Sequence, residues 1–351
     1  MGSGEFTFID LFAGIGGFRV GLERLGGRCV FGSEIDKHAI ATYERNFGDK
    51  PAGDITKIEA EDVPSHDLLC GGFPCQPFSI SGKRLGFEDA RGTLFFEVMR
   101  LVNHHKPKAV FLENVANYKT HQGGKTLEIT LGMLRDAGYL VRCEILNASN
   151  YGVPQARKRL YIVGIREDLE VGGFEFPEAH DGRTYLKDIL LPASHVVESR
   201  IVRDDMRITK KDISDEFKRR PNKPIKIGVI NKGGQGERIY SIDGHAITLS
   251  AYGGGAAAKT GAYLVGDVVR KLDPRECARL MGFPEEYKID PRRNQAYKQF
   301  GNAVVANVIE AIGRKLVTQV GFKVPTKEQQ LLSIDPQTTC HLENGGTLPK
   351  A

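Results

Sequence analysis

Short apolar runs alternate with amphipathic stretches over residues 6–166, and this alternation constrains the fold more than any other feature of the chain. The apolar runs are rich in aromatic and β-branched residues, which predicts buried strands. The stretches between them repeat apolar residues at helical spacing. The pattern therefore predicts an α/β domain with a mainly parallel sheet and helices on both faces. Strands are expected at Phe6–Phe12, Cys29–Glu34, Asp67–Gly71, Ala109–Glu113 and Arg159–Ile165, and helices at Gly17–Leu25, Lys37–Phe47, Thr93–His104 and Lys125–Ala137.

The alternation stops after residue 166, where prolines, charges and glycine-rich runs such as Gly253–Gly255 replace it. No helical period longer than two turns is visible there, which predicts a smaller, loop-rich second lobe. Helical spacing returns at Pro274–Met281 and Asn302–Leu316, and we expect this last helix to pack back onto the first domain. The expected divisions are a catalytic and cofactor-binding domain at 6–166, a second lobe at 167–268, a return segment at 269–322 and a flexible tail at 323–351.

Composition excludes several classes of protein. No apolar run approaches the ~20 residues that span a bilayer, and no signal peptide is visible, so a cytoplasmic protein without a membrane partner is expected. The six cysteines form no Cys-x-x-Cys pair and no cluster with zinc spacing, so neither a disulfide framework nor a bound metal is expected.

Positive charge gathers in one segment. Residues 200–238 contain 12 Lys/Arg and 6 Asp/Glu, whereas the whole chain carries only +5. Such a run is often simply a solvated face. It would also suit a phosphate-contacting surface on the second lobe.

A glycine loop follows the first expected strand, where a Rossmann-like domain places its ligand loop. Gly14 and Gly16 would let the backbone approach a ligand closely. Glu34, at the end of the second strand, could bind ribose hydroxyls. Dinucleotide enzymes and S-adenosylmethionine enzymes share this layout, so the loop defines a nucleoside-bearing ligand but no chemistry. Asp54 and Ile55 could contact an adenine, although a simple turn aspartate fits equally well.

Cys75 stands between Pro74 and Gln76 in a loop at the carboxyl edge of the predicted sheet, where an inert core cysteine has no obvious place. Its thiolate would be the nucleophile. Glu113, at the same edge, could act as a proton donor or could merely cap a helix. Arg157 and Arg159 are two apart, so in a strand they would point the same way, toward a phosphate or base carbonyl or into solvent.

Taken together, the motifs resemble the cytosine carbon-5 DNA methyltransferases. Six motifs occur in the family's order: Phe12–Gly17, Gly72–Gln76, Glu113–Val115, Gln155–Arg159, Arg270–Glu276 and Gln299–Val304. The resemblance implies a Rossmann-like S-adenosylmethionine-dependent methyltransferase domain with a loop-rich target-recognition domain.

The resemblance also implies the roles of particular residues. Cys75 would add to carbon 6 of a cytosine flipped out of the duplex, Glu113 would hold the ring nitrogen and exocyclic amine, and Arg157 and Arg159 would orient the base and the loop. Carbon 5 would take the methyl group, leaving S-adenosyl-L-homocysteine. The implied cofactor contacts are Phe12, Gly14, Gly16, Glu34, Ile35, Asp54, Ile55, Pro74, Leu94 and Asn302.

Residues 233–240 and 246–255 resemble the recognition segment of a family member specific for GCGC. Double-stranded DNA methylated at the inner cytosine is the implied substrate. Gln235 and Ser81 would fill the space left by the flipped base, Arg238, Tyr252 and Gly253 would lie against base edges, and Thr248 would hold a phosphate. A monomer is expected, together with a cognate restriction endonuclease acting on the same site.

One position departs from that member. Ile35 stands where it has a tryptophan, and the chain contains no tryptophan at all, so stacking on the adenine would be replaced by aliphatic contact. Three alternatives remain open: a nicotinamide-dependent oxidoreductase, a catalytically silent DNA-binding relative, and a tRNA methyltransferase. The first leaves Cys75 and the paired arginines unexplained.

Overall fold

A computed structural model describes residues 6–74, 94–180, 184–209 and 223–323. Its main sheet has six strands in the order β2-β1-β3-β4-β7-β5. The first four are parallel, whereas β7 is antiparallel to β4 and β5 is antiparallel to β7. These strands are β1 (Thr7–Leu11), β2 (Arg28–Ser33), β3 (Leu68–Gly72), β4 (Ala109–Val115), β5 (Tyr139–Asn147) and β7 (Lys158–Arg166).

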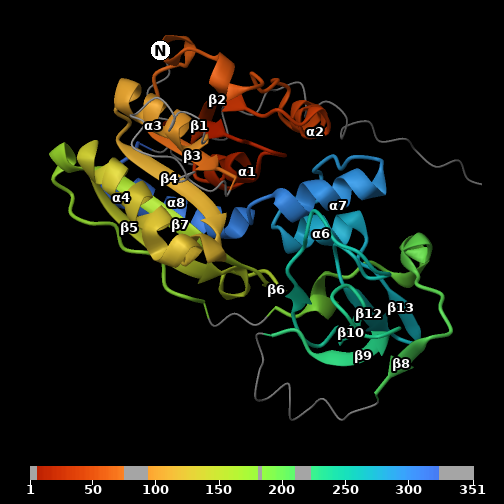
Figure 1. Ribbon diagram of the computed structural model, residues 1–351. Coiled ribbons are helices and arrows are strands. Elements are labelled where there is room, and N and C mark those ends of the chain that lie inside the picture. Colours follow the sequence, from red (N-terminus) through yellow and green to blue (C-terminus); the bar gives the residue numbers. More distant parts are fainter. Residues whose placement is uncertain (1–5, 75–93, 181–183, 210–222, 324–351) are drawn as a thin grey trace, which may run out of the picture.

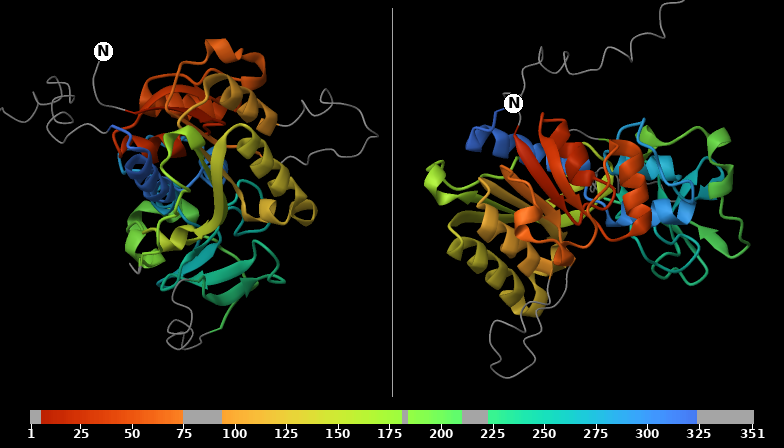
Figure 2. Two further views of the ribbon diagram at one scale, coloured as in Figure 1. Left: turned by 90° about the vertical axis from the view of Figure 1, so that its left-hand side faces the viewer. Right: turned by 90° about the horizontal axis from the view of Figure 1, so that it is seen from above.

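Helices cover both faces of the sheet, as expected (Figures 1 and 2). Side chains of alternate β1 residues enter different cores: Phe8 packs with α1 and α8, while Ile9 packs with α3. This alternation follows from the two-residue period of a strand. The helices are α1 (Gly17–Glu23), α2 (Lys37–Phe47), α3 (Leu94–His105), α4 (Lys125–Asp136), α6 (Pro274–Leu280), α7 (Arg293–Asn302) and α8 (Ala306–Val320).

The C-terminal helix α8 returns to the first domain, as the sequence predicts. A side-chain carbon at Gly21 of α1 would lie 2.8 Å from the carbonyl oxygen of Ala306, so only glycine permits this contact between α1 and α8. The predicted start of that helix at Asn302 is wrong. Asn302 ends α7, and α8 begins at Ala306 after an extended residue at Ala303 (ψ 155°).

The second lobe contains a separate five-stranded sheet in the order β13-β12-β10-β9-β8. Its small core includes Ile230, Ile239 and Val269. Within the described part of residues 167–268 the helical turns are all 3-10 turns of three or four residues, in agreement with the loop-rich expectation. The strands are β8 (Met206–Ile208), β9 (Lys226–Ile230), β10 (Arg238–Ser241), β12 (Ala262–Val265) and β13 (Val268–Arg270).

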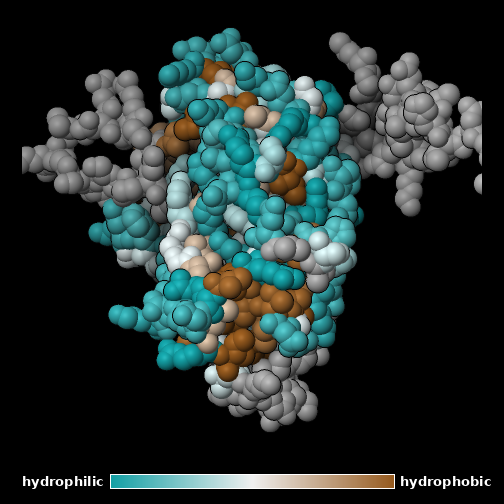
Figure 3. Space-filling view, turned by 90° about the vertical axis from the view of Figure 1, so that its right-hand side faces the viewer, coloured by the Kyte–Doolittle hydropathy of each residue, from teal (hydrophilic) through white to brown (hydrophobic). Residues whose placement is uncertain are grey.

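A two-stranded ladder joins the lobes, because β6 (Gln155–Ala156) pairs in parallel with β11 (Ala246–Ile247). The second lobe is therefore hydrogen-bonded to the segment that enters β7. Viewed from the side of this lobe, the surface carries a hydrophobic patch (Figure 3), and Val202 and Ile208 are exposed aliphatic residues of the lobe. Across the described ranges, no helix has the length and apolar character needed to cross a membrane.

Candidate active site

A cavity of about 540 Å³ opens at the carboxyl ends of β1 to β4, the edge at which α/β sheets bind ligands. Residues from both predicted classes line it together. They are Phe12, Gly14, Glu34, Ile35, Asp54, Ile55, Pro74, Leu94 and Asn302 from the cofactor set, and Glu113, Arg157 and Arg159 from the catalytic set. Tyr252 of the second lobe also lines the cavity. Cys75 and Ser81 lie outside the described residues.

The loop between β1 and α1 is held by Glu34. One carboxylate oxygen, Oε2, accepts the backbone N–H of Gly14 at 2.8 Å, and the other accepts those of Ile35 at 2.8 Å and Asp36 at 2.7 Å. An ionised carboxylate has about four acceptor positions. Glu34 therefore fixes the loop and keeps capacity for one more donor, such as a ribose hydroxyl.

Gly16 does not line the cavity. Its lack of a side chain is needed instead for close packing between the loop and α2. Its φ is +82°, and a side-chain carbon there would lie 2.4 Å from the ring of Phe47. Gly16 thus permits the sharp turn into α1 against α2, while Gly14 faces open space. Gly16, which was predicted to contact the cofactor, therefore lies behind the residues that line the cavity.

Ile35 and Asp54 lie on the cavity wall with different surroundings. Ile35 is 73% exposed, so an apolar surface is available to a planar ligand. The Asp54 carboxylate accepts the backbone N–H of Thr56 at 3.1 Å and its hydroxyl at 2.8 Å, and these bonds lower the pKa of Asp54. Asp54 therefore caps a turn, as a simple turn aspartate would, and it also lines the cavity, as an adenine-contacting residue would.

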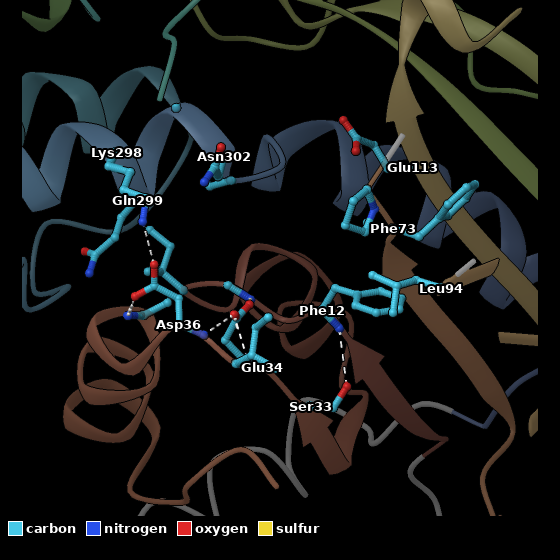
Figure 4. A pocket seen from close by; sticks show the side chains of 18 of the residues that line it. Phe12, Ser33, Glu34, Asp36, Phe73, Leu94, Glu113, Lys298, Gln299 and Asn302 are labelled. Carbon is cyan, nitrogen blue, oxygen red and sulfur yellow. Dashed lines mark hydrogen bonds and ion pairs between the residues drawn. The ribbon is translucent and has the colours of Figure 1, made fainter. Parts of the chain in front are cut away.

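Glu113 is buried on β4 and reaches into the cavity (Figure 4). Burial raises the pKa of its carboxyl, while the charges of Arg159 and Arg157 oppose the rise. The Arg159 Nε lies 3.1 Å from Glu113 Oε1. On the neighbouring strand, Gly72 lies beside the carboxyl, and a side-chain carbon there would be in ordinary contact with Oε2 at 3.6 Å. Glu113 is therefore a buried acid whose ion-pair partner, among the residues that the structure describes, is the Arg159 guanidinium.

Arg157 and Arg159 line the same cavity but have different partners. Arg157 is 2% exposed, and its terminal nitrogens donate to three backbone carbonyls: Leu249 at 3.0 Å, Gly301 at 3.1 Å and Ala303 at 2.9 Å. Burial and the charge of Arg159 lower the pKa of Arg157 to about 9. The expectation that both guanidinium groups point at one spot therefore does not hold, because only Arg159 pairs with Glu113.

Several cavity residues had no role assigned from the sequence. Asn114 donates from Nδ2 to the carbonyl of Phe73 at 3.0 Å, which anchors the backbone just before Pro74. Lys298 of α7 pairs with Asp36 at the start of α2, with 2.7 Å between Nζ and Oδ2 (Figure 4). Asn114 belongs to the motif Glu113–Val115, so the sequence pointed to it. The Lys298–Asp36 pair joins residues that are 262 positions apart, and no local sequence pattern predicts it.

The predicted DNA contacts that the structure describes gather on the second lobe. Gln235, Arg238, Tyr252 and Gly253 are exposed. The glycine-rich runs around them touch, since a side-chain carbon at Gly236 would lie 2.1 Å from the Gly254 carbonyl oxygen. Thr248 is placed differently: it is half-buried, and its hydroxyl donates to the Ala156 carbonyl at 2.6 Å.

A mainly parallel α/β sheet, a glycine loop tied to an acidic residue and a buried acid beside an arginine define a Rossmann-like enzyme with a nucleoside-bearing cofactor. The family model of the C-5 cytosine-specific DNA methylases matches residues 6–318. The chain belongs to this family; it is a DNA (cytosine-5-)-methyltransferase, and its methyl donor is S-adenosylmethionine. This membership decides against the nicotinamide-dependent oxidoreductase.

Relatives support the assignment over nearly the whole chain. The type II methyltransferase M.HhaI of Haemophilus parahaemolyticus is 52% identical over 90% of this chain and 95% of its own length. M.HpaII of Haemophilus parainfluenzae is 44% identical over 90% of each chain. The crystal structure of the S. pombe Dnmt2 methyltransferase shares the fold, with a TM-score of 0.69, 20% identity and coverage of 91% of this chain and 100% of that one.

Proposed function

We propose that the chain methylates the inner cytosine of GCGC in double-stranded DNA, with Cys75 as nucleophile. The observation that carries the chemistry is Glu113, a buried acid with a raised pKa that faces the cavity beside Arg159. A carboxyl group whose pKa is raised by burial binds a proton more readily than an exposed one and can donate it to a ring nitrogen. Pro74, which also lines the cavity, brings the chain to its edge one residue before Cys75.

In the proposed mechanism the target cytosine leaves the base stack, which costs a few kcal/mol. The Cys75 thiolate forms a bond to carbon 6, while Glu113 donates to the ring nitrogen and accepts from the exocyclic amine. Carbon 5 thereby becomes nucleophilic. When bound, S-adenosylmethionine supplies an electrophilic methyl group to that carbon. Loss of the carbon-5 proton to water and departure of the Cys75 sulfur as thiolate restore the double bond, and the ring-nitrogen proton returns to Glu113.

The cofactor fits the residues present. Gly14 and Glu34 would hold the ribose end, and Ile35, Asp54 and Ile55 would surround the adenine, with Phe12, Pro74, Leu94 and Asn302 along the remaining wall. Ile35 offers aliphatic contact to the adenine.

Target recognition is proposed for the exposed residues of the second lobe. Arg238 suits the paired acceptors of a guanine in the major groove. Gln235, with Ser81, would take the place of the flipped base. Tyr252 would read a base edge, and Gly253 would also contact the DNA. We also propose that the protein acts as a monomer in the cytoplasm, together with a restriction endonuclease of the same specificity. The proposed divisions of the chain are a catalytic domain at 6–166, a target-recognition domain at 167–268, a return segment at 269–322 and a tail at 323–351.

Bisulfite sequencing of plasmid DNA from expressing cells tests the target site. Protection of the inner cytosine of GCGC is expected, and complete conversion there would refute the site. Cys75→Ser is expected to abolish methylation while duplex binding persists. Cys143→Ser is the matched control, because Cys143 lies on β5 and does not line the cavity. Substantial methylation by Cys75→Ser would exclude Cys75 as the nucleophile.

A further inference from the structure

Phe12, which lines the cavity, has a backbone conformation that its own side chain disfavours. Its φ is +57°, in the left-handed region where the Cβ atom of an L-residue crowds the following carbonyl oxygen. Among the aromatic residues that the structure describes, no other has a positive φ. A residue in such a conformation persists only where its surroundings hold it there, and such residues gather at ligand sites. The conformation of Phe12 therefore needs a cause beside the cavity.

The end of β2 holds this part of the chain. The Oγ of Ser33 accepts the N–H of Phe12 at 3.4 Å (Figure 4), and the Ser33 carbonyl oxygen accepts the N–H of Ala13 at 2.9 Å. The next residue, Glu34, accepts the N–H of Gly14 at 2.8 Å. Three successive N–H groups of the glycine loop thus donate to two successive residues at the end of β2. Because the direction of an N–H group depends on the local backbone dihedrals, these bonds together fix the loop in its left-handed turn.

Ser33 is buried and yet borders the cavity. It is 1% exposed, it lines the cavity, and in the sheet it lies opposite Leu11, the residue before Phe12. The Phe12 ring lies over Gly71 of β3, where an added side-chain carbon would be in ordinary contact with the ring at 3.6 Å. The ring therefore keeps its place on the cavity wall only while the backbone of Phe12 keeps its present dihedrals.

We propose that Ser33 is a positioning residue: its hydroxyl holds Phe12 in the left-handed conformation and so places the Phe12 ring against bound S-adenosylmethionine. The inference rests on the proposed function, in which Phe12 contacts the cofactor, and it adds the residue that sets this contact. Without the hydroxyl, the Phe12 N–H loses its acceptor, and φ can relax toward the negative values that a phenylalanine favours. The ring must then be ordered when the ligand binds, and that ordering lowers the affinity.

Ser33→Ala removes the hydroxyl and leaves the carbonyl group that holds Ala13. Isothermal titration calorimetry with S-adenosyl-L-homocysteine should show about fivefold weaker binding, the typical effect of losing one hydrogen bond. The KM for S-adenosylmethionine should rise by a similar factor, while kcat at saturation stays within about twofold of the wild type, because the groups that carry out the chemistry are unchanged.

Ser241→Ala is the matched control. Ser241 is a buried serine whose Oγ also accepts a backbone N–H, that of Asp243 at 3.2 Å, but it lies on β10 and does not line the cavity. The affinity of Ser241→Ala for S-adenosyl-L-homocysteine should therefore equal that of the wild type.

A double-mutant cycle with Phe12→Leu distinguishes positioning from a direct contact between Ser33 and the ligand. Leucine has no ring to place, so Ser33→Ala should weaken binding less than about twofold in this background if Ser33 acts through Phe12. An undiminished loss in the Phe12→Leu background would show that Ser33 touches the ligand itself, and it would overturn the inference.

Hydrogen exchange of the ligand-free protein reports on the same contact without a cofactor. Peptides that span residues 8–16 should exchange faster in Ser33→Ala than in the wild type, whereas Ser241→Ala should match the wild type. Unchanged exchange in this region, or unchanged affinity of a Ser33→Ala protein with a cooperative thermal transition, would also overturn the inference. Neither result bears on the proposed function. Failure of the wild type to bind S-adenosyl-L-homocysteine would instead remove the cavity as the cofactor site.

Discussion

At the residue scale, burial decides what a charged side chain does. Glu113 and Asp10 are both buried carboxyl groups with raised pKa values, but Glu113 faces the cavity and has Arg159 beside it. Asp10 lies on β1, 1% exposed, and neither of its oxygens has a hydrogen-bond partner within the described structure. Burial, the largest cause, raises the pKa of Asp10 from 3.8 to about 8, against the charge of Arg19.

Asp10→Asn should therefore flatten the dependence of stability on pH. A carboxyl whose pKa is higher in the folded state favours folding most strongly below its unfolded value of 3.8, and this advantage is lost as pH rises through about 8. The free energy of unfolding of the wild type should fall more steeply between about pH 4 and about pH 8 than that of Asp10→Asn. Urea denaturation across this range measures both slopes, and parallel slopes would contradict the expectation.

Much of the cavity wall could be predicted because motif residues follow the ends of consecutive strands, which meet at one edge of a parallel sheet. The hydrogen-bond partners of long, buried side chains could not be predicted from the sequence. Strand periodicity suggested that Arg157 and Arg159 point together, but Arg157 lies between β6 and β7 and turns toward carbonyl groups of distant segments. Such contacts depend on the tertiary fold and leave no local pattern.

At the scale of elements, the parallel strands and their helices were predicted within one or two residues, because each is a nearly continuous apolar run or a clear helical repeat. Strand β5 was missed. Its burial alternates in part, since Tyr139 and Val141 are buried while Leu140 and Arg142 are exposed, as expected for an edge strand that is only half covered. Helix α7 was missed as well, because its polar sequence RNQAYKQFGN has little apolar periodicity.

The junction between β13 and α6 depends on a buried ion pair. Arg270 and Glu276 are 3% and 0% exposed at their side chains and form two hydrogen bonds of 2.8 Å. Glu276 also accepts the N–H groups of Leu191 and Asp273, so it ties three segments together.

Arg270→Met should destabilise the fold strongly, because it leaves the Glu276 charge buried without its partner. Breaking such a pair costs about 3–5 kcal/mol. Arg203→Met is the control, since Arg203 pairs with Asp205 on the surface and a much smaller change is expected. Urea denaturation of both variants provides the comparison; equal stability of the two would show that the buried pair contributes little.

At the scale of the whole molecule, charge is divided between the lobes. The net charge is +5, yet residues 200–238 alone carry +6, so the rest of the chain is close to neutral. DNA binding through this lobe should weaken steeply with salt, because each phosphate contact contributes a slope of about −0.9 to log K against log salt.

Lys232→Ala should reduce that salt slope by about one contact, because Lys232 is exposed beside the glycine run that precedes Arg238. The loss should be the same for any duplex sequence, since phosphates carry no sequence information. Lys315→Ala, an exposed change on α8, is the control and should leave the slope unaltered. Fluorescence anisotropy at several salt concentrations measures the slope. An unchanged slope for Lys232→Ala would show that Lys232 does not contact a DNA phosphate.

The five-stranded sheet is built entirely from chain that leaves the main sheet after β7 and returns before α6. In Figure 1 this sheet lies apart from the main sheet, below α6 and α7. Replacing its loops would change neither the strand order around the cavity nor the residues at the strand ends. The recognition lobe and the catalytic domain can therefore diversify at different rates. New target sequences can arise by replacing loops of the second lobe, provided that the replacement keeps the close backbone contact with Gly301.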